Sequence, residues 1–126
     1  PQSSLALEHP ERSGVSAGDR APDAPIRGAA GQPLRLFDLF RGVHWTLLGF
    51  GVARGAVQPR PGFHIHVFGL DGGVIDEQGH FQNAYKLAIG EWVLVRPDGY
   101  IGAIVSSDDL ERLEAYLARV GLPLSP

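Results

Sequence analysis

Apolar runs separated by glycine- and proline-containing stretches divide the chain into short elements. The run Trp-Thr-Leu-Leu-Gly-Phe at 45–50 is nearly continuous and has strand length, which predicts a central strand buried on both faces. At 63–68 apolar and polar residues alternate with a period of two, which predicts a second strand. The stretch between them, 51–62, holds three glycines and two prolines and predicts a loop.

The last third of the chain predicts a β-hairpin followed by an amphipathic helix. Two apolar runs within 91–105 flank Pro97-Asp98-Gly99, where proline presets φ, aspartate can cap its own backbone and glycine tolerates a positive φ. Ser106 or Ser107 can then cap a helix with an acidic first turn, which Gly121 ends. Apolar residues spaced by three and four predict the face of this helix that packs on the core: Leu110, Leu113, Tyr116, Leu117 and Val120.

Outside these stretches the chain predicts a lead-in and three short elements. Residues 1–17 are rich in serine, proline, glycine and charge, so we expect a linker there and the packed domain at 18–126. A short strand is expected near Ile26, a helical turn over 36–40 and a short helix over 81–87.

The resulting order is β-α-β-loop-β-α-β-β-α. This order is typical of an α/β fold of the thioredoxin-like type, with a central mixed β-sheet, a C-terminal β-hairpin and helices on both faces. An α+β sandwich of unrelated topology is the alternative. At 126 residues the chain is expected to form one core.

Composition excludes several classes of function. The net charge of −3 and the dispersed arginines leave no basic surface for nucleic acid. No apolar run approaches the ~20 residues of a membrane helix, and no signal peptide begins the chain, so a cytoplasmic protein is expected. The absence of cysteine excludes disulfides, thiol nucleophiles and a Cys-x-x-Cys redox pair.

Two histidines are the metal-ligand candidates. His64 and His66 lie two apart on a predicted strand, so both point to one face and can bind a metal together. A third ligand would have to come from the following loop: His80, Asp76 or Glu77. The alternative, which we favour, is that the two histidines form the solvent-facing side of a half-buried strand, so no metal site is assigned.

Other polar and aromatic residues also have a structural interpretation beside the chemical one. His44 with Asp38 can be a base and its orienting carboxylate, but a histidine capping the end of the 36–40 helix is the simpler interpretation. The carboxylates Asp71, Asp76 and Glu77 fit turn and surface positions better than acid–base catalysis. The large aromatic residues are expected in the core: Trp45, Trp92, Phe63, Phe68 and Tyr100.

The position of the redox site in a thioredoxin-like fold carries no redox chemistry here. The reactive dithiol of such proteins follows the central strand, where a helix N-terminus lowers the thiol pKa. The equivalent stretch, 51–57, has no cysteine, serine or threonine, and 84–91 lacks the proline that would form the usual cis peptide. We therefore expect a scaffold with no catalytic residue of its own.

Four segments in order resemble the C-terminal domain of FAD-dependent aromatic hydroxylases of the phenol hydroxylase and polyketide hydroxylase type. They are Gly-Asp-Arg-Ala-Pro-Asp at 18–23, Leu-Phe-Asp-Leu-Phe at 36–40, His-Trp-Thr-Leu-Leu-Gly-Phe at 44–50, and Leu-Val-Arg-Pro-Asp-Gly-Tyr at 94–100. The resemblance implies a thioredoxin-like domain without the dithiol, appended to flavin- and substrate-binding domains. It implies FAD and NAD(P)H for the parent protein, a phenolic substrate, and contacts with the preceding domains or in a homodimer.

No cofactor-binding residue is expected in this segment, because it contains no Gly-x-Gly-x-x-Gly motif. The resemblance therefore favours a non-catalytic association or stabilising domain of an FAD-dependent aromatic-ring monooxygenase. A free-standing, cysteine-free binding module for a protein or small ligand is the alternative, and a metal enzyme built on His64 and His66 is a third possibility. In each case Arg96 and Asp98 are expected to serve the hairpin turn and not to touch substrate.

Overall fold

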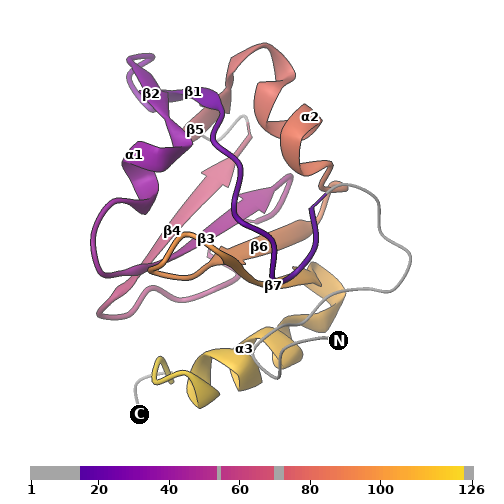
Figure 1. Ribbon diagram of the computed structural model, residues 1–126. Helices are drawn as coiled ribbons and strands as arrows, with labels where there is room; N and C mark the ends of the chain where they lie inside the picture. Colours follow the sequence, from indigo (N-terminus) through magenta and orange to yellow (C-terminus); the bar gives the residue numbers. More distant parts are fainter. Residues whose placement is uncertain (1–14, 54, 70–72, 124–126) are drawn as a thin grey trace.

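The computed structural model describes residues 15–53, 55–69 and 73–123. They form a mixed sheet of seven strands in the order β2-β1-β5-β4-β3-β6-β7, with helices on both faces (Figure 1). The elements in chain order are β1 (Pro25–Gly28), β2 (Pro33–Arg35), α1 (Leu36–Phe40), β3 (Trp45–Phe50), β4 (Phe63–Phe68), β5 (Val74–Asp76), the 3-10 turn η1 (Glu77–Gly79), α2 (His80–Tyr85), β6 (Glu91–Val95), β7 (Ile101–Ser106), the 3-10 turn η2 (Ser107–Asp109) and α3 (Leu110–Arg119). The predicted mixed sheet, C-terminal hairpin and helices on both faces are confirmed.

Strand β3 is the central strand, as its continuous apolar run predicts. It pairs in parallel with β4 and antiparallel with β6. Successive side chains of a strand point to opposite faces, so Leu47 packs under α3 while Leu48 packs under α1 and α2. Neither leucine has any exposed surface.

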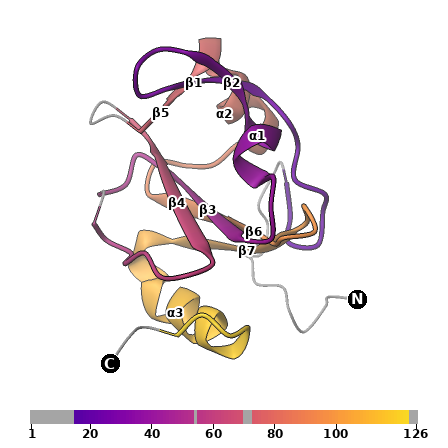
Figure 2. The same ribbon diagram turned by 90° about the vertical axis from the view of Figure 1, so that its left-hand side faces the viewer.

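The two faces of the sheet carry separate cores, and Figure 2 shows α3 on the side opposite α1 and α2. On the α1 and α2 face, the ring of Phe81 stacks on Phe68 at 3.9 Å and on Tyr85 at 4.7 Å between centroids. The Tyr85 hydroxyl donates to the carbonyl of Pro22 at 2.6 Å, which ties α2 to the chain that precedes β1. Burial raises the pKa of Tyr85, so the phenol stays protonated as a donor.

Helix α3 covers the other face with the stripe that its spacing predicts. Ser106 Oγ accepts from the Asp108 N–H at 3.1 Å, as expected for a serine at the start of this segment. Leu113, Tyr116 and Leu117 have no exposed surface. On apolar area alone, each such side chain stabilises the fold by about 1.5–3 kcal/mol relative to an exposed position.

A buried arginine joins α3 to the loop before β4. The Arg60 guanidinium donates to both carboxylate oxygens of Glu114, at 2.7 and 3.0 Å, and to the Leu122 carbonyl at 3.0 Å. Its Nε donates to the Gln58 carbonyl at 3.0 Å. The Arg60 side chain is 3% exposed, so the 51–62 loop is held in place although it contains no regular element among its described residues.

The segment before β1 adds to the sheet beside the hairpin. Gly18 N–H donates to the Ile101 carbonyl, Ile101 N–H to Asp19, and Ala21 N–H to Gly99, each at 2.8 Å. The predicted linker at 1–17 lies largely outside the described residues, and Val15, at its end, is buried in the core of the α1 and α2 face. The predicted turn at 71–73 also lies mostly outside the described residues.

Strands β2 and β5 and the exposure of Tyr100 differ from the sequence-based expectations. Strands β2 and β5 have three residues each and no alternation to reveal them; both are extended because they pair with β1. The expectation that Tyr100 lies in the core is wrong: it is 39% exposed, and its ring lies beside the Arg20 guanidinium, 5.8 Å from Cζ to centroid. The other aromatic predictions hold for Trp92, Phe63 and Phe68, which are at most 2% exposed, while Trp45 is partly exposed.

No helix in the described part of the chain has the length and apolar character needed to cross a bilayer.

Candidate functional site

The carboxyl end of β3, where a thioredoxin-like fold would carry its dithiol, forms an apolar hollow. The hollow has a volume of about 590 Å³ and is lined mainly by Phe50, Gly51, Phe68, Ile75 and Ile89, with Ala29, Gly69 and Asp76 at its edge. Ile89 is 81% exposed and Ile75 is 46% exposed. We refer to this site as the apolar hollow.

Among its described lining residues, the apolar hollow has one ionisable side chain, Asp76. Its carboxylate, Asp76, already accepts from the Phe81 and Gln82 N–H groups at 2.7 and 3.0 Å and so caps α2. Glu77, the other carboxylate considered from the sequence, pairs with Arg27 at 2.5 Å. Both acidic residues therefore have the structural roles that the sequence favours.

Three histidines gather on one face near the start of β3 and β4. The rings of His44 and His64 are stacked with centroids 3.8 Å apart, and His66 follows His64 on the same face of β4. Burial lowers the pKa of His66 from its usual 6.5, and the charges of His64 and His44 lower it further. His44 Nε2 lies 2.8 Å from the Leu39 carbonyl, so its predicted role at the end of α1 is confirmed.

The histidine cluster does not have the geometry of a metal centre. The rings of His44 and His64 are nearly parallel, with 21° between their planes. The nitrogen lone pairs lie in the ring planes, so those of this stacked pair do not point to a shared metal ion. Within the part of the chain that the structure describes, no group of three histidine, cysteine, aspartate or glutamate residues could hold a metal ion. The sequence candidates His64 and His66 are thus brought to His44, and no third ligand from His80, Asp76 or Glu77 joins them.

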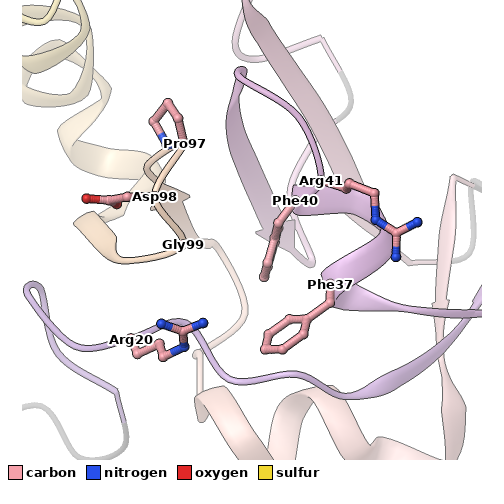
Figure 3. A pocket seen from close by; sticks show the side chains of 7 residues that line it. All are labelled: Arg20, Phe37, Phe40, Arg41, Pro97, Asp98 and Gly99. Carbon is pink, nitrogen blue, oxygen red and sulfur yellow. The ribbon is translucent and has the colours of Figure 1, made fainter.

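A second hollow lies at the opposite end of β3, where three of the four segments singled out in the sequence meet. It has a volume of about 290 Å³ and is lined by Arg20, Phe37, Phe40, Arg41, Pro97, Asp98 and Gly99 (Figure 3). We refer to it as the arginine hollow. The sequence singled out these segments but could not show that they converge.

Local hydrogen bonds place these three segments. The Asp23 carboxylate accepts hydrogen bonds from Arg35 Nε at 2.6 Å and from the Phe37 N–H at 3.0 Å. The segment before β1 therefore holds the first turn of α1. Burial acts to raise the pKa of Asp23, but the hydrogen bonds from Arg35 and Phe37 outweigh it and leave the pKa below 3.8. The hairpin turn is held on the same segment by the Ala21-to-Gly99 hydrogen bond.

The arginine hollow combines positive charge with an aromatic floor. The Arg41 side chain is 80% exposed, and its nearest ion-pair partner is Asp38 at 3.4 Å. Phe37 is 43% exposed, whereas Phe40 is 8% exposed. The figure shows both rings between the two arginines.

The hairpin carboxylate does not neutralise these arginines. Asp98 accepts from Arg96 at 2.8 Å and from the Tyr100 N–H at 3.2 Å. Its carboxylate points away from the phenylalanine rings in Figure 3. The arginine hollow therefore offers charge-assisted hydrogen bonds to an anion beside an apolar surface, and among its lining residues it offers no nucleophile.

Comparison with known proteins places this fold in context. A family model described as "Aromatic-ring hydroxylase, C-terminal" matches residues 15–121. A flavin-dependent monooxygenase from Mycobacteroides abscessus is 37% identical over 106 residues, a match that covers 84% of this chain and 18% of that protein. The chain thus spans less than one fifth of the length of this relative.

Solved structures support the thioredoxin-like fold. The flavin-dependent monooxygenase PieE, solved in complex with FAD and substrate, is similar with a TM-score of 0.69 and 24% identity over 86% of this chain and 20% of that chain. The thioredoxin domain of a thiol-disulfide oxidoreductase from Bacteroides vulgatus is similar with a TM-score of 0.61 and 19% identity, over 81% of this chain and 98% of that domain. The predicted thioredoxin-like fold is confirmed, here on a chain without cysteine.

Proposed function

Because the chain belongs to the aromatic-ring hydroxylase C-terminal family, we propose that it is a non-catalytic domain that stabilises an FAD-dependent aromatic-ring monooxygenase. The parent protein would hydroxylate a phenolic substrate with NAD(P)H and O₂ in the cytoplasm. This domain would associate with the preceding flavin- and substrate-binding domains, and a homodimer is a further form of association that we propose.

The observation that carries the proposal is the chemistry of the apolar hollow. It occupies the place of a thioredoxin-like redox site, yet isoleucine and phenylalanine side chains line it and its carboxylate is engaged in capping α2. Such a surface can pack against another domain, and its described lining residues include no thiol, hydroxyl or imidazole. An associating role accounts for this better than a catalytic one.

The apolar hollow also does not fit the flavin cofactor. Binding of a pyrophosphate requires several free backbone N–H groups or cationic side chains. The apolar hollow presents an anionic side chain, Asp76, whose oxygens already receive the two N–H groups at the start of α2. We propose that FAD and NAD(P)H bind to the preceding domains of the parent protein, where they would supply the redox chemistry.

Deleting this domain from the parent protein tests the proposal. We expect the truncated parent to melt several degrees lower and to retain less FAD, because it loses interdomain contacts. Turnover per bound flavin should stay within twofold of the intact protein. Differential scanning calorimetry, flavin absorbance and NAD(P)H oxidation measure these three quantities.

The same experiment can reject the proposal in two ways. If melting temperature and FAD content do not change on deletion, the domain does not stabilise the parent. If turnover per bound flavin falls by tenfold or more while both are unchanged, the domain takes part in catalysis. Sedimentation of the intact and truncated proteins reports separately on the homodimer.

A further inference from the structure

We infer that the arginine hollow docks a carboxylate-bearing segment of the preceding domains of the same polypeptide. The inference rests on the proposed function, since it names the surface and the chemistry of the association. The occupant is a peptide segment with an aspartate or glutamate side chain next to an apolar residue. The carboxylate would pair with Arg20 or Arg41, which lie on the two sides of the phenylalanine rings (Figure 3), and the apolar residue would lie on Phe37.

The charge of the arginine hollow is the first argument. A guanidinium has five N–H donors in a planar fork, and its full use requires a carboxylate or several carbonyls. Arg41 has Asp38 at 3.4 Å, and that carboxylate also accepts the Arg35 N–H at 2.9 Å. Arg20 lies beside the Tyr100 ring and has no carboxylate partner among the described residues. Most donors of both arginines are therefore available to an incoming carboxylate.

The exposed aromatic ring is the second argument. Phe37 and its neighbour Leu36 lie on the same helical turn, but Leu36 has no exposed surface and Phe37 is 43% exposed. The first turn of α1 is anchored through the Phe37 N–H on Asp23, so the ring is held at the surface beside the arginines. Covering an exposed phenylalanine ring removes apolar surface from water, which favours docking. An apolar residue next to the docked carboxylate would supply that cover.

The position of the hollow selects the occupant. Residues 18–21 are paired with the hairpin turn that forms one wall of the hollow. The chain that leads into Arg20 therefore runs along β7 and the hairpin turn, and Arg20 lies five residues after Val15, the first described residue. The matched relative from Mycobacteroides abscessus has most of its length outside the match, which covers 18% of it. A covalently attached segment has a millimolar effective concentration for a short flexible tether, which favours it over an unlinked partner.

Charge reversal in the intact parent protein tests the inference. Arg41→Glu is the test variant and Arg112→Glu is the matched control, because both arginines are exposed and both lie in an i,i+3 pair with an aspartate. Arg20→Glu is the second test variant. Hydrogen exchange is measured on peptides that cover 37–41 and 97–100, and on 47–49 of β3 as a report on folding.

In the intact parent we expect the first two peptides to exchange at least tenfold faster in Arg41→Glu and Arg20→Glu than in Arg112→Glu. The β3 peptide should exchange equally in all three. Raising the salt concentration in the unmodified parent should also speed exchange of the first two peptides, because screening weakens the docked ion pairs.

Two outcomes would overturn the inference. Equal exchange at 37–41 and 97–100 in the test and control variants, with β3 intact, would show that nothing acidic docks there. Protection that disappears on dilution would assign the surface to a second copy instead. The proposed function survives both results if deletion of the domain still lowers the melting temperature of the parent, so the two proposals can fail separately.

Discussion

The two ends of the central strands differ in the groups they present. Where β3 and β4 begin, the antiparallel β6–β7 hairpin brings its turn beside α1, and the arginine hollow forms there. Where both strands end, Phe50 and Phe68 meet the exposed Ile89, and the apolar hollow forms. One end has charged groups without full partners, and the other has apolar surface without reactive groups.

The difference also separates this chain from a redox protein of the same fold. In a thioredoxin-like redox protein the reactive dithiol follows the central strand. Here that end keeps a concave apolar surface, while the exposed guanidinium groups of Arg20 and Arg41 lie at the other end. The fold is compatible with association at both ends, and neither hollow contains a nucleophile among its lining residues.

The largest effect is expected where the strands begin, at the ion pair that holds the loop on α3. Arg60→Ala removes a 3% exposed guanidinium that makes two hydrogen bonds to Glu114 and one to the Leu122 carbonyl. We expect the free energy of unfolding to fall by about 3 kcal/mol, near the lower end for breaking a buried pair because Glu114 remains partly exposed. Urea denaturation measures the change.

Arg112→Ala is the control for this prediction. Its guanidinium is 56% exposed and lies 4.0 Å from Asp109, so its removal should change the unfolding free energy by less than about 0.5 kcal/mol. A loss below 1 kcal/mol for Arg60→Ala would mean that this end of the sheet does not depend on its buried ion pair.

A smaller effect is expected at the end of β3, where backbone and side chains approach closely. A Cβ atom on Gly49 would lie 2.5 Å from Val52 Cγ2 and 2.7 Å from Trp92 Cζ3. Gly49→Ala should therefore destabilise the chain by about 2 kcal/mol through overpacking. Gly55→Ala is the matched control, because a Cβ there meets nothing within 4 Å. Equal stability of the two variants would show that this end repacks freely.

Sequence patterns predicted the elements whose own residues show a continuous or regularly spaced set of apolar positions. The apolar run at 45–50 and the stripe on α3 identify a central strand and a core-facing helix, and both have the predicted positions. Strands β2 and β5 were not predicted, because three residues are too few to show an alternation of apolar and polar positions. Their extended form depends on pairing with β1.

The candidate site was predicted less completely than the fold. The family segments at 18–23, 36–40 and 94–100 were recognised one by one, but their meeting in one hollow depends on long-range pairing. The local sequence of Tyr100 also resembles that of a core strand, yet Tyr100 lies just outside β7, beside Arg20. Side-chain surroundings of this kind are set by the tertiary fold and not by local pattern.

The smallest expected effect distinguishes the two ends by their response to pH. His66 has a pKa below its usual 6.5, first because of burial and then because of the charges of His64 and His44. Between that lowered pKa and 6.5 the unfolded chain binds more protons at this position than the folded chain does. The contribution of His66 to stability is therefore constant above this window and decreases as the pH falls through it.

Urea denaturation at pH 7.5, 6.5 and 5.5 measures how the free energy of unfolding decreases with pH, and His66→Gln should make this decrease smaller. His80→Gln, at an exposed position on α2, should leave it unchanged. If His66→Gln and the unmodified chain lose stability in parallel, the acid sensitivity does not arise from the histidine cluster where the strands begin.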